Sequence, residues 1–133
     1  MIDLIGILLV SHSEKIAQGL KEMLEEMVST DLVQIIASGG TGDGRLGTNA
    51  IMIYEHICSL EECQAIYIFN DIGSSVLSSE SALDMLDDEQ LIEKITVIDA
   101  PLIEGAFIGA VQASIGATKE SILEEIKNEF GGK

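Results

Sequence analysis

Apolar residues gather along this chain in four short runs, at residues 4–10, 32–38, 65–69 and 95–98. The first run, LIGILLV, has no polar position in it. A run of this kind is typical of a strand that is buried on both faces, as in a parallel sheet. The pattern therefore predicts four buried strands.

The segments between these runs have the period of amphipathic helices. The helix over residues 14–28 is expected to bury one face, made of Ile16, Leu20, Met23, Leu24, Met27 and Val28. A second helix is expected after a cap at Thr48 or Asn49, and a third, ending near Leu86, is expected to bury Val76, Leu77, Leu83 and Leu86. The last two are expected over about residues 103–116 and after a cap at Thr118.

Strands that alternate with helices define the expected fold class. They predict an α/β fold with a mostly parallel four-stranded sheet and helices on both faces. The chain of 133 residues has no linker or repeat, so one domain is expected over residues 1–133. Ligands of such sheets bind at the carboxyl ends of the strands, near the point where the strand order reverses. Four loops lie there: residues 11–13, 39–47, 71–75 and 99–105.

His12 stands between Ser11 and Ser13, where the first strand gives way to a helix. Either Ser11, in a capping box with Glu14, or Ser13 is the cap of that helix. Both arrangements place the imidazole beside the positive end of a helix, which favours a neutral ring and attracts anions. A neutral imidazole is a nucleophile for a phosphoryl group, so His12 is the candidate catalytic residue. A surface histidine at a helix start is the alternative.

Asp71 follows the third strand, which is expected to neighbour the first. Its carboxylate can accept a hydrogen bond from one ring nitrogen of His12 and leave the other nitrogen free to attack. The alternative role for Asp71 is a helix cap. The next residues, Gly73, Ser74 and Ser75, offer backbone and hydroxyl donors for phosphate oxygens.

The glycine-rich loop at residues 39–47 contains Gly42, Gly44 and Gly47 in the spacing of a dinucleotide fingerprint. It follows the second strand, whereas the first strand-to-helix turn has no glycine, and this disfavours dinucleotide binding. We expect instead a flexible loop over the site that carries Arg45 and Thr48 toward a phosphate or a partner, with Gly40 as a further phosphate-binding or loop-support residue.

Charge narrows the class of partner. The chain has 23 acidic and 7 basic residues and a net charge of −16, which repels nucleic acid and anionic membranes. A basic surface is the complementary partner. The N-terminus lacks the basic start of a signal peptide, so the cytoplasm is the expected location.

Three further features have ordinary interpretations. Cys58 and Cys63 match no common zinc or redox spacing and are expected to be buried or half-buried thiols. His56 is expected to be solvated on the polar side of its helix. The small residues between positions 105 and 113 are expected to pack in the core, with a dimer contact as the alternative.

Four stretches resemble one family: LVSHS at 9–13, GTNA at 47–50, NDIGSSVLSSESALDML at 70–86 and APLIEGAFIGAV at 100–111. They are similar to the mannose-type IIA domains of the phosphoenolpyruvate-dependent sugar phosphotransferase system. The second pair of stretches is most similar to the branch that serves dihydroxyacetone kinases.

The resemblance implies a phosphocarrier of the mannose-type IIA fold. His12 would carry a phosphoryl group received from HPr, and Asp71 would orient His12. The group would pass to ADP held on DhaL, which phosphorylates dihydroxyacetone bound on DhaK. Family members form homodimers, and the resemblance implies no metal or other cofactor.

Three alternatives stay open at this point. In one, the chain is a IIA component of a sugar transporter that passes its phosphoryl group to a IIB protein. In another, it is a non-catalytic regulatory module of the same fold. In the third, it is a nucleotide-binding α/β protein that uses the glycine loop.

Overall fold

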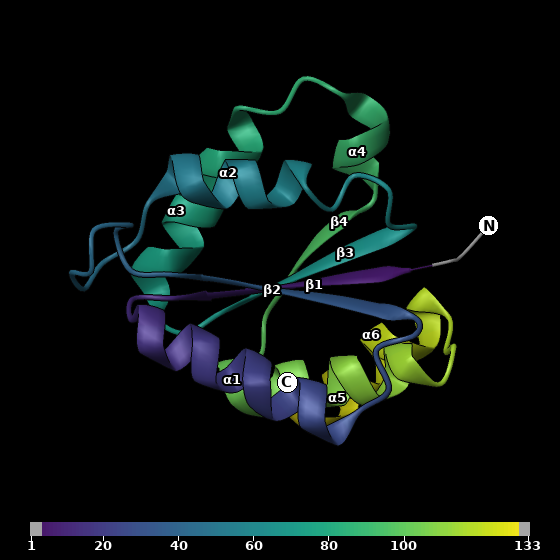
Figure 1. Cartoon of the computed structure of the whole chain (residues 1–133). Helices are drawn as coiled ribbons and strands as arrows, with labels where there is room; N and C mark the ends of the chain where they lie inside the picture. The colour runs from purple at the N-terminus through teal and green to yellow at the C-terminus, as the bar shows by residue number, and fades with distance from the viewer. Residues whose placement is uncertain (1–3, 131–133) are drawn as a thin grey trace.

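The computed structural model describes residues 4–130 and contains a four-stranded parallel sheet between two layers of helices (Figure 1). The strands are β1 (Ile5–Ser11), β2 (Val33–Gly39), β3 (Ala65–Asn70) and β4 (Ile95–Ile98). The helices are α1 (Glu14–Met27), α2 (Ala50–Cys58), α3 (Gly73–Asp84), α4 (Glu89–Glu93), α5 (Leu102–Ser114) and α6 (Lys119–Phe130). The predicted fold class is confirmed.

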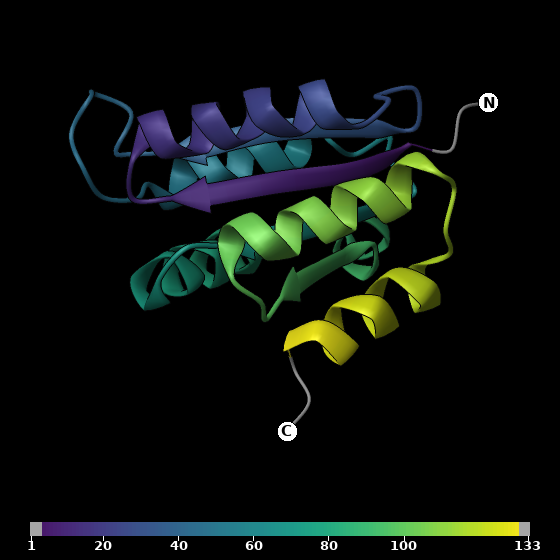
Figure 2. The ribbon, with the colours of Figure 1, turned by 90° about the horizontal axis from the view of Figure 1, so that it is seen from below.

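The strand order is β2-β1-β3-β4, with every pair parallel. The chain builds outward from β1 to β2 on one side and from β3 to β4 on the other, so the order reverses between β1 and β3. Helices α1, α5 and α6 cover one face of the sheet, and α2, α3 and α4 cover the other (Figures 1 and 2). His12 and Asp71 directly follow the two strands at the reversal.

The small residues of α5 let this helix approach the sheet closely. Phe69 of β3 fills the space beside Gly105 and Gly109, where an added Cβ at Gly109 would lie 2.9 Å from the ring. Ala106, Ala110 and Ala113 are buried in the same layer. The expected core packing of this run is confirmed.

The expected apolar face of α1 is partly wrong. Ala17, Leu20 and Leu24 form the buried stripe, whereas Ile16, Met23 and Met27 are 51%, 41% and 56% exposed. The helix lies over the β2 side of the sheet, so only a narrow stripe faces the strands.

The expected core of α3 is also wrong in part. This helix buries Ser75, Ser79 and Ala82, while Leu77 is 65% exposed. The buried serine hydroxyls make hydrogen bonds, which removes most of the cost of burying them.

Other predictions about single elements vary in outcome. Asn49 caps α2 through a bond from the Met52 amide, and Thr118 accepts a bond from the Ser121 amide at the start of α6. The short helix α4, capped by Asp88, was not expected from the sequence. The prediction for His56 is wrong: it is half-buried, and burial lowers the pKa of its imidazole.

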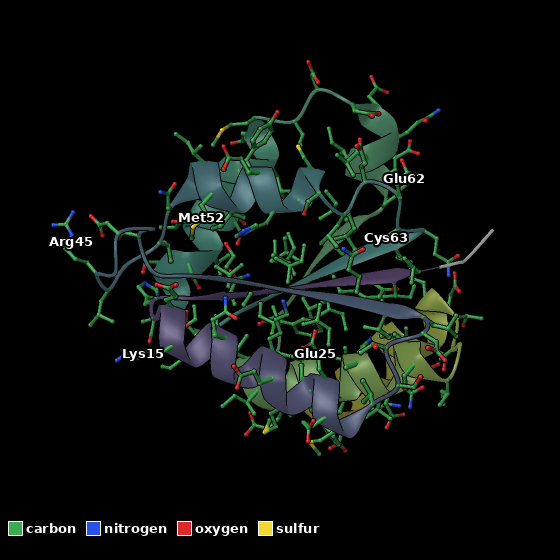
Figure 3. All side chains as sticks on the ribbon, viewed as in Figure 1. Lys15, Glu25, Arg45, Met52, Glu62 and Cys63 are labelled. Atoms are coloured by element: carbon green, nitrogen blue, oxygen red, sulfur yellow. The ribbon has the colours of Figure 1, made fainter. Side chains whose placement is uncertain are left out.

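The cysteines lie away from the carboxyl end of the strands. Cys63 is buried and Cys58 is half-buried, as expected. Figure 3 labels Cys63 at the end of the sheet opposite the glycine loop. Among residues 4–130, no helix is long and apolar enough to cross a membrane.

Candidate functional site

His12 lies in the turn between β1 and α1, and the structure decides which serine caps this helix. Ser13 is the cap, because its hydroxyl oxygen accepts a hydrogen bond from the Ile16 amide at 3.2 Å. His12 therefore precedes the helix. Ser11 has a different task, since its fully buried hydroxyl donates to Asp71 Oδ2 at 3.0 Å.

Asp71 binds both the backbone and the ring of His12. The His12 amide donates to Asp71 Oδ2 at 2.9 Å, and His12 Nδ1 lies 3.0 Å from Asp71 Oδ1. Their side chains are 24% and 19% exposed. A carboxylate only accepts hydrogen bonds, so it selects the ring form that has its proton on Nδ1. In the neutral ring, Nε2 is then left with its lone pair.

The Asp71 carboxyl group stays ionised far below neutral pH. Burial on its own raises the pKa, but hydrogen bonds from the His12 amide, the His12 ring and the Ile72 amide outweigh burial and lower the pKa to about 2. The Ile72 amide donates to Oδ1 at 2.7 Å. Both carboxylate oxygens are occupied by donors, which fixes the carboxylate plane and with it the His12 ring.

The free nitrogen of His12 faces the start of α3. His12 Nε2 is hydrogen-bonded to the Ser74 hydroxyl, in the first turn of this helix. No side chain among residues 4–130 caps α3, whose flanking residue is Ile72. The Ser75 amide donates to the Ile72 carbonyl at 2.9 Å, whereas the amides that begin an uncapped helix otherwise lack intrahelical partners and favour an anion. The side of His12 that holds the lone pair therefore faces a group of anion-binding donors.

The other residues predicted around the site have supporting positions. Gly73, at the exposed start of α3, can offer its amide, but Ser75 is fully buried and its hydroxyl donates to the Ile72 carbonyl. The phosphate-binding part of the prediction for Ser75 is therefore corrected: its hydroxyl faces the loop and not the ring of His12. Ser75 supports the loop that holds Asp71.

The glycine loop packs against the His12 turn through its backbone. The Gly47 amide donates to the His12 carbonyl at 2.8 Å, and the Gly40 amide donates to the Ser11 carbonyl at 3.1 Å. Gly40 has φ +74°, and an added Cβ there would lie 3.0 Å from the Arg45 carbonyl oxygen. Because its amide is used in this way, Gly40 shapes the loop and does not donate to a ligand.

Thr48 and Arg45 of the loop bond partners other than the ring of His12. Thr48 bonds Ser78 in the second turn of α3. Arg45 forms an ion pair with Asp43 at 3.1 Å and extends from the exposed tip of the loop (Figure 3). The expectation that Arg45 reaches toward a phosphate is not met in this conformation.

A hollow of about 330 Å³ lies beside Asp71, between the ends of β3 and β4. Val76, Val97 and Ala100 are among the residues that line it. Within residues 4–130 there is no group of three or more His, Cys, Asp or Glu side chains that could hold a metal ion.

The fold and the site define a class of protein, a parallel α/β domain with an oriented histidine at the reversal of strand order. Residues 6–123 match the EIIA-man family, described as the PTS system fructose IIA component. The chain belongs to this family.

Similar proteins agree with this assignment. The chain is 59% identical to the PEP-dependent dihydroxyacetone kinase 2 phosphoryl donor subunit DhaM of Listeria innocua, over 94% of this chain and 98% of that protein. It is 33% identical to the PTS-dependent dihydroxyacetone kinase phosphotransferase subunit DhaM of Lactococcus lactis, over 92% and 93%. The resemblance to this branch, expected from the motifs, is confirmed.

Two further comparisons concern length and fold. The DhaM of Escherichia coli is 30% identical over 98% of this chain, which spans only 28% of that longer protein. The crystal structure of EF1359, a protein of unknown function, superposes with a TM-score of 0.83 at 42% identity, over 96% of this chain and 94% of that one.

Asn70 and Ser79 were not among the predicted site residues. Their side chains form a buried hydrogen bond of 2.8 Å directly behind Asp71. The sequence contains a signal for this contact, because serines at positions 75 and 79 recur at the spacing of one helical face. That spacing predicts a buried face only where the residues are apolar, so the pattern of apolar positions did not predict this contact.

Proposed function

We propose that this protein is a phosphocarrier that accepts a phosphoryl group on His12 Nε2 and passes it on to a dihydroxyacetone kinase. The observation that supports this most directly is the pair of contacts on the His12 ring. Asp71 holds Nδ1, and Nε2 faces Ser74 at the uncapped start of α3. The names of the similar proteins point to the same kinase system.

The transfer is a displacement at phosphorus. The Nε2 lone pair attacks the phosphoryl group, and the bond from phosphorus to the nitrogen of the donor's phosphohistidine breaks. The proton on Nδ1 stays in place, and the positive charge that develops on the ring is stabilised by the Asp71 carboxylate. Ser74 turns its hydroxyl from Nε2 to a phosphoryl oxygen, and the first-turn amides of α3 face the remaining charge.

The family suggests the two partners. We propose phospho-HPr as the donor and ADP bound on DhaL as the acceptor, with DhaK receiving the group indirectly through ATP on DhaL. In the second step an oxygen of the terminal ADP phosphate attacks phosphorus, and the bond to Nε2 breaks with its electron pair. The net charge of −16 favours docking of a basic donor surface.

Incubation with phosphoenolpyruvate, enzyme I and HPr tests the first transfer. Intact mass at neutral pH is expected to rise by one phosphoryl group that is lost in acid, and His12→Ala is expected to gain nothing. His56→Ala is the matched control, because it removes the other histidine and leaves the site untouched. Absence of the gain in the wild type would contradict the proposal.

The acceptor is tested by adding partners to the phosphorylated protein. Discharge by ADP-loaded DhaL supports the dihydroxyacetone kinase role. Discharge only by a IIB protein would support a sugar-transporter IIA component, and discharge by neither would favour a regulatory module. The homodimer and the cytoplasmic location expected from the resemblance and the sequence stay predictions, and light scattering at several protein concentrations checks the first.

A further inference from the structure

Helix α3 has serines in two neighbouring rows, each with a spacing of four residues. One row contains Ser74 and Ser78, and the other contains Ser75 and Ser79. Residues four apart lie on the same face of a helix, one turn from each other. The first row meets the His12 ring and the glycine loop, whereas the second row is fully buried toward the sheet.

The buried row binds the residues on either side of Asp71. The Ser79 hydroxyl donates to Asn70 Oδ1 at 2.8 Å, and the Ser75 hydroxyl donates to the Ile72 carbonyl at 2.7 Å. Asn70 ends β3, and Ile72 precedes α3. Asp71 therefore lies between Asn70, which the Ser79 hydroxyl ties to α3, and Ile72, whose carbonyl accepts both the hydroxyl and the amide of Ser75.

We propose that Ser75 and Ser79 are positioning residues that hold the Asp71 carboxylate, and through it the His12 ring, in the geometry for phosphoryl transfer. The kinetic part of this inference rests on the proposed function, whereas its structural part does not. Both serines are 0% exposed, so neither meets a partner, and their hydroxyls bond the Ile72 carbonyl and Asn70 Oδ1 and not the His12 ring.

The Asn70 side chain depends on Ser79 for its orientation. Asn70 is 5% exposed, and its Nδ2 has no hydrogen-bond partner among the described residues. Loss of the Ser79 hydroxyl would leave both polar ends of this amide without a bond, and a buried amide in that condition turns or draws in water. Asn70 is the residue next to Asp71, so its displacement moves the carboxylate.

A small movement of Asp71 has a large effect because of what the carboxylate fixes. It receives the amide of His12, the ring Nδ1 of His12 and the hydroxyl of Ser11, at 2.9 to 3.0 Å. A displacement of about 1 Å in such a constellation can reduce a rate by about a hundredfold. We therefore expect Ser79→Ala to slow phosphorylation of His12 about tenfold, as only one of the two ties is lost.

The first measurement uses the unphosphorylated protein, so it does not depend on the proposed function. The ¹⁵N shifts of the His12 ring report which nitrogen holds the proton. We expect the Nδ1–H form in the wild type and a larger share of the Nε2–H form in Ser79→Ala. The second measurement is the rate of phosphorylation by phospho-HPr, where kcat is expected to fall and KM to stay unchanged.

Ala82→Gly is the matched control. Ala82 is buried on the same helix, three residues after Ser79, and makes no contact with the Asp71 loop through a side-chain hydrogen bond. The glycine weakens the helix, so this variant separates general loss of stability from displacement of Asp71. It is expected to be less stable and to keep the His12 spectrum and kcat of the wild type.

Ser79→Cys keeps the inference testable if Ser79→Ala does not fold. A thiol fills nearly the same space but is a weak donor, so its ring spectrum and kcat should lie between those of the wild type and of Ser79→Ala. Equal His12 spectra in wild type, Ser79→Ala and Ser79→Cys would overturn the inference, as would an equal change in Ala82→Gly. If the wild type is not phosphorylated by phospho-HPr, the proposed function fails, and the ring spectra still decide the positioning role.

Discussion

Helices α1 and α3 begin at the same edge of the sheet, after neighbouring strands, but their first turns are completed differently. The start of α1 is capped by Ser13 and has the acidic Glu14 at its first position. The start of α3 is flanked by Ile72, has no side-chain cap among the described residues and has no acidic residue in its first turn. The first turn of α1 has a side-chain cap, whereas the first turn of α3 has none among residues 4–130, and there the Ser75 amide bonds the Ile72 carbonyl and the Ser74 hydroxyl bonds His12 Nε2.

This difference corrects one physical argument from the sequence. The sequence predicted donors for an anion at two places, the start of the helix that directly follows His12 and the segment Gly73 to Ser75. The donors of α1 are partly occupied by Ser13, and an anion there would meet Glu14. The donors that His12 faces belong to α3, a helix more than sixty residues further along the chain. The comparison of α1 with α3 indicates that an anion-binding helix end is recognised by the absence of a side-chain cap and of an acidic residue in its first turn.

The largest expected effect comes from a change at Asp71, the residue that orients the His12 ring so that Nε2 faces α3. Asp71→Asn replaces an acceptor oxygen with a donor, so it cannot accept from Ser11, Ile72 and both His12 groups at once. We expect phosphorylation of His12 to slow by about a hundredfold or more, in line with loss of a correctly oriented base. Stopped-flow transfer from phospho-HPr measures this, and a rate within a factor of about three of the wild type would contradict it.

A proline at each helix start tests the comparison between α1 and α3 directly. Gly73→Pro removes one amide donor from α3, and Glu14→Pro does the same in α1; both are first helical positions, where proline is tolerated. The preceding residues, Ile72 and Ser13, already have extended backbones that suit proline. We expect about a tenfold slower transfer for Gly73→Pro and no change for Glu14→Pro.

Equal effects of the two prolines would show that the two helix ends are not different. Circular dichroism on both variants checks that the helices are kept. The equilibrium level of phosphorylated His12, measured by intact mass, should fall only in Gly73→Pro.

Alanine at Ser13 and at Ser74 is expected to have smaller effects, one on stability and the other on the rate of transfer. Ser13→Ala removes a cap, so we expect a loss of about 1 kcal/mol in the free energy of unfolding and little change in transfer. Ser74→Ala removes a hydroxyl that contacts Nε2, so we expect transfer to slow by a few-fold, about 1 kcal/mol in barrier, at unchanged stability. Urea denaturation and transfer kinetics on both proteins check this. Slower transfer in Ser13→Ala together with lower stability in Ser74→Ala would contradict it.

The smallest expected effect is in the pH dependence of stability. The pKa of Asp71 is about 2 in the folded protein, below its ordinary value of 3.8, so its ionised form stabilises the fold above about pH 4. That contribution is lost as the pH falls from about 4 to about 2. The difference in unfolding free energy between wild type and Asp71→Asn should therefore narrow over this range. Urea titrations at each pH measure it, and a constant difference would mean that the pKa of Asp71 is not lowered.

Much of this structure was predictable because its strands are apolar runs and its loops are distinctive. The apolar runs such as LIGILLV and AIYIF predicted the four strands and their parallel arrangement. The loops after these two runs predicted that His12 and Asp71 meet. The motifs also led to the family. These signals are local in the sequence. The rule that ligands bind at the reversal of strand order then predicts where the site lies on the sheet.

Other features depend on contacts that no local pattern contains. The burial of Ser75 and Ser79 in place of Leu77 depends on acceptors from β3 and the loop after it, Asn70 Oδ1 and the Ile72 carbonyl. The exposure of Ile16 follows from the narrow face that α1 turns to the sheet, made of Ala17, Leu20 and Leu24. Arg45 turns to Asp43, two residues away, and so does not reach the site. The position of Ser79 depends on a partner in β3, whereas Arg45 and Ser75 bond residues two and three positions away that hydrophobicity and charge alone did not indicate.

The central claim is that Asp71 holds His12 Nδ1 and leaves Nε2 to receive the phosphoryl group at the open end of α3. The most direct measurement is a ¹⁵N and ³¹P NMR spectrum of the phosphorylated protein with labelled histidine. The account predicts coupling between phosphorus and Nε2 of His12, with the proton kept on Nδ1. Phosphorus bound to Nδ1 would contradict it, because that nitrogen would then have to leave Asp71 before it could react.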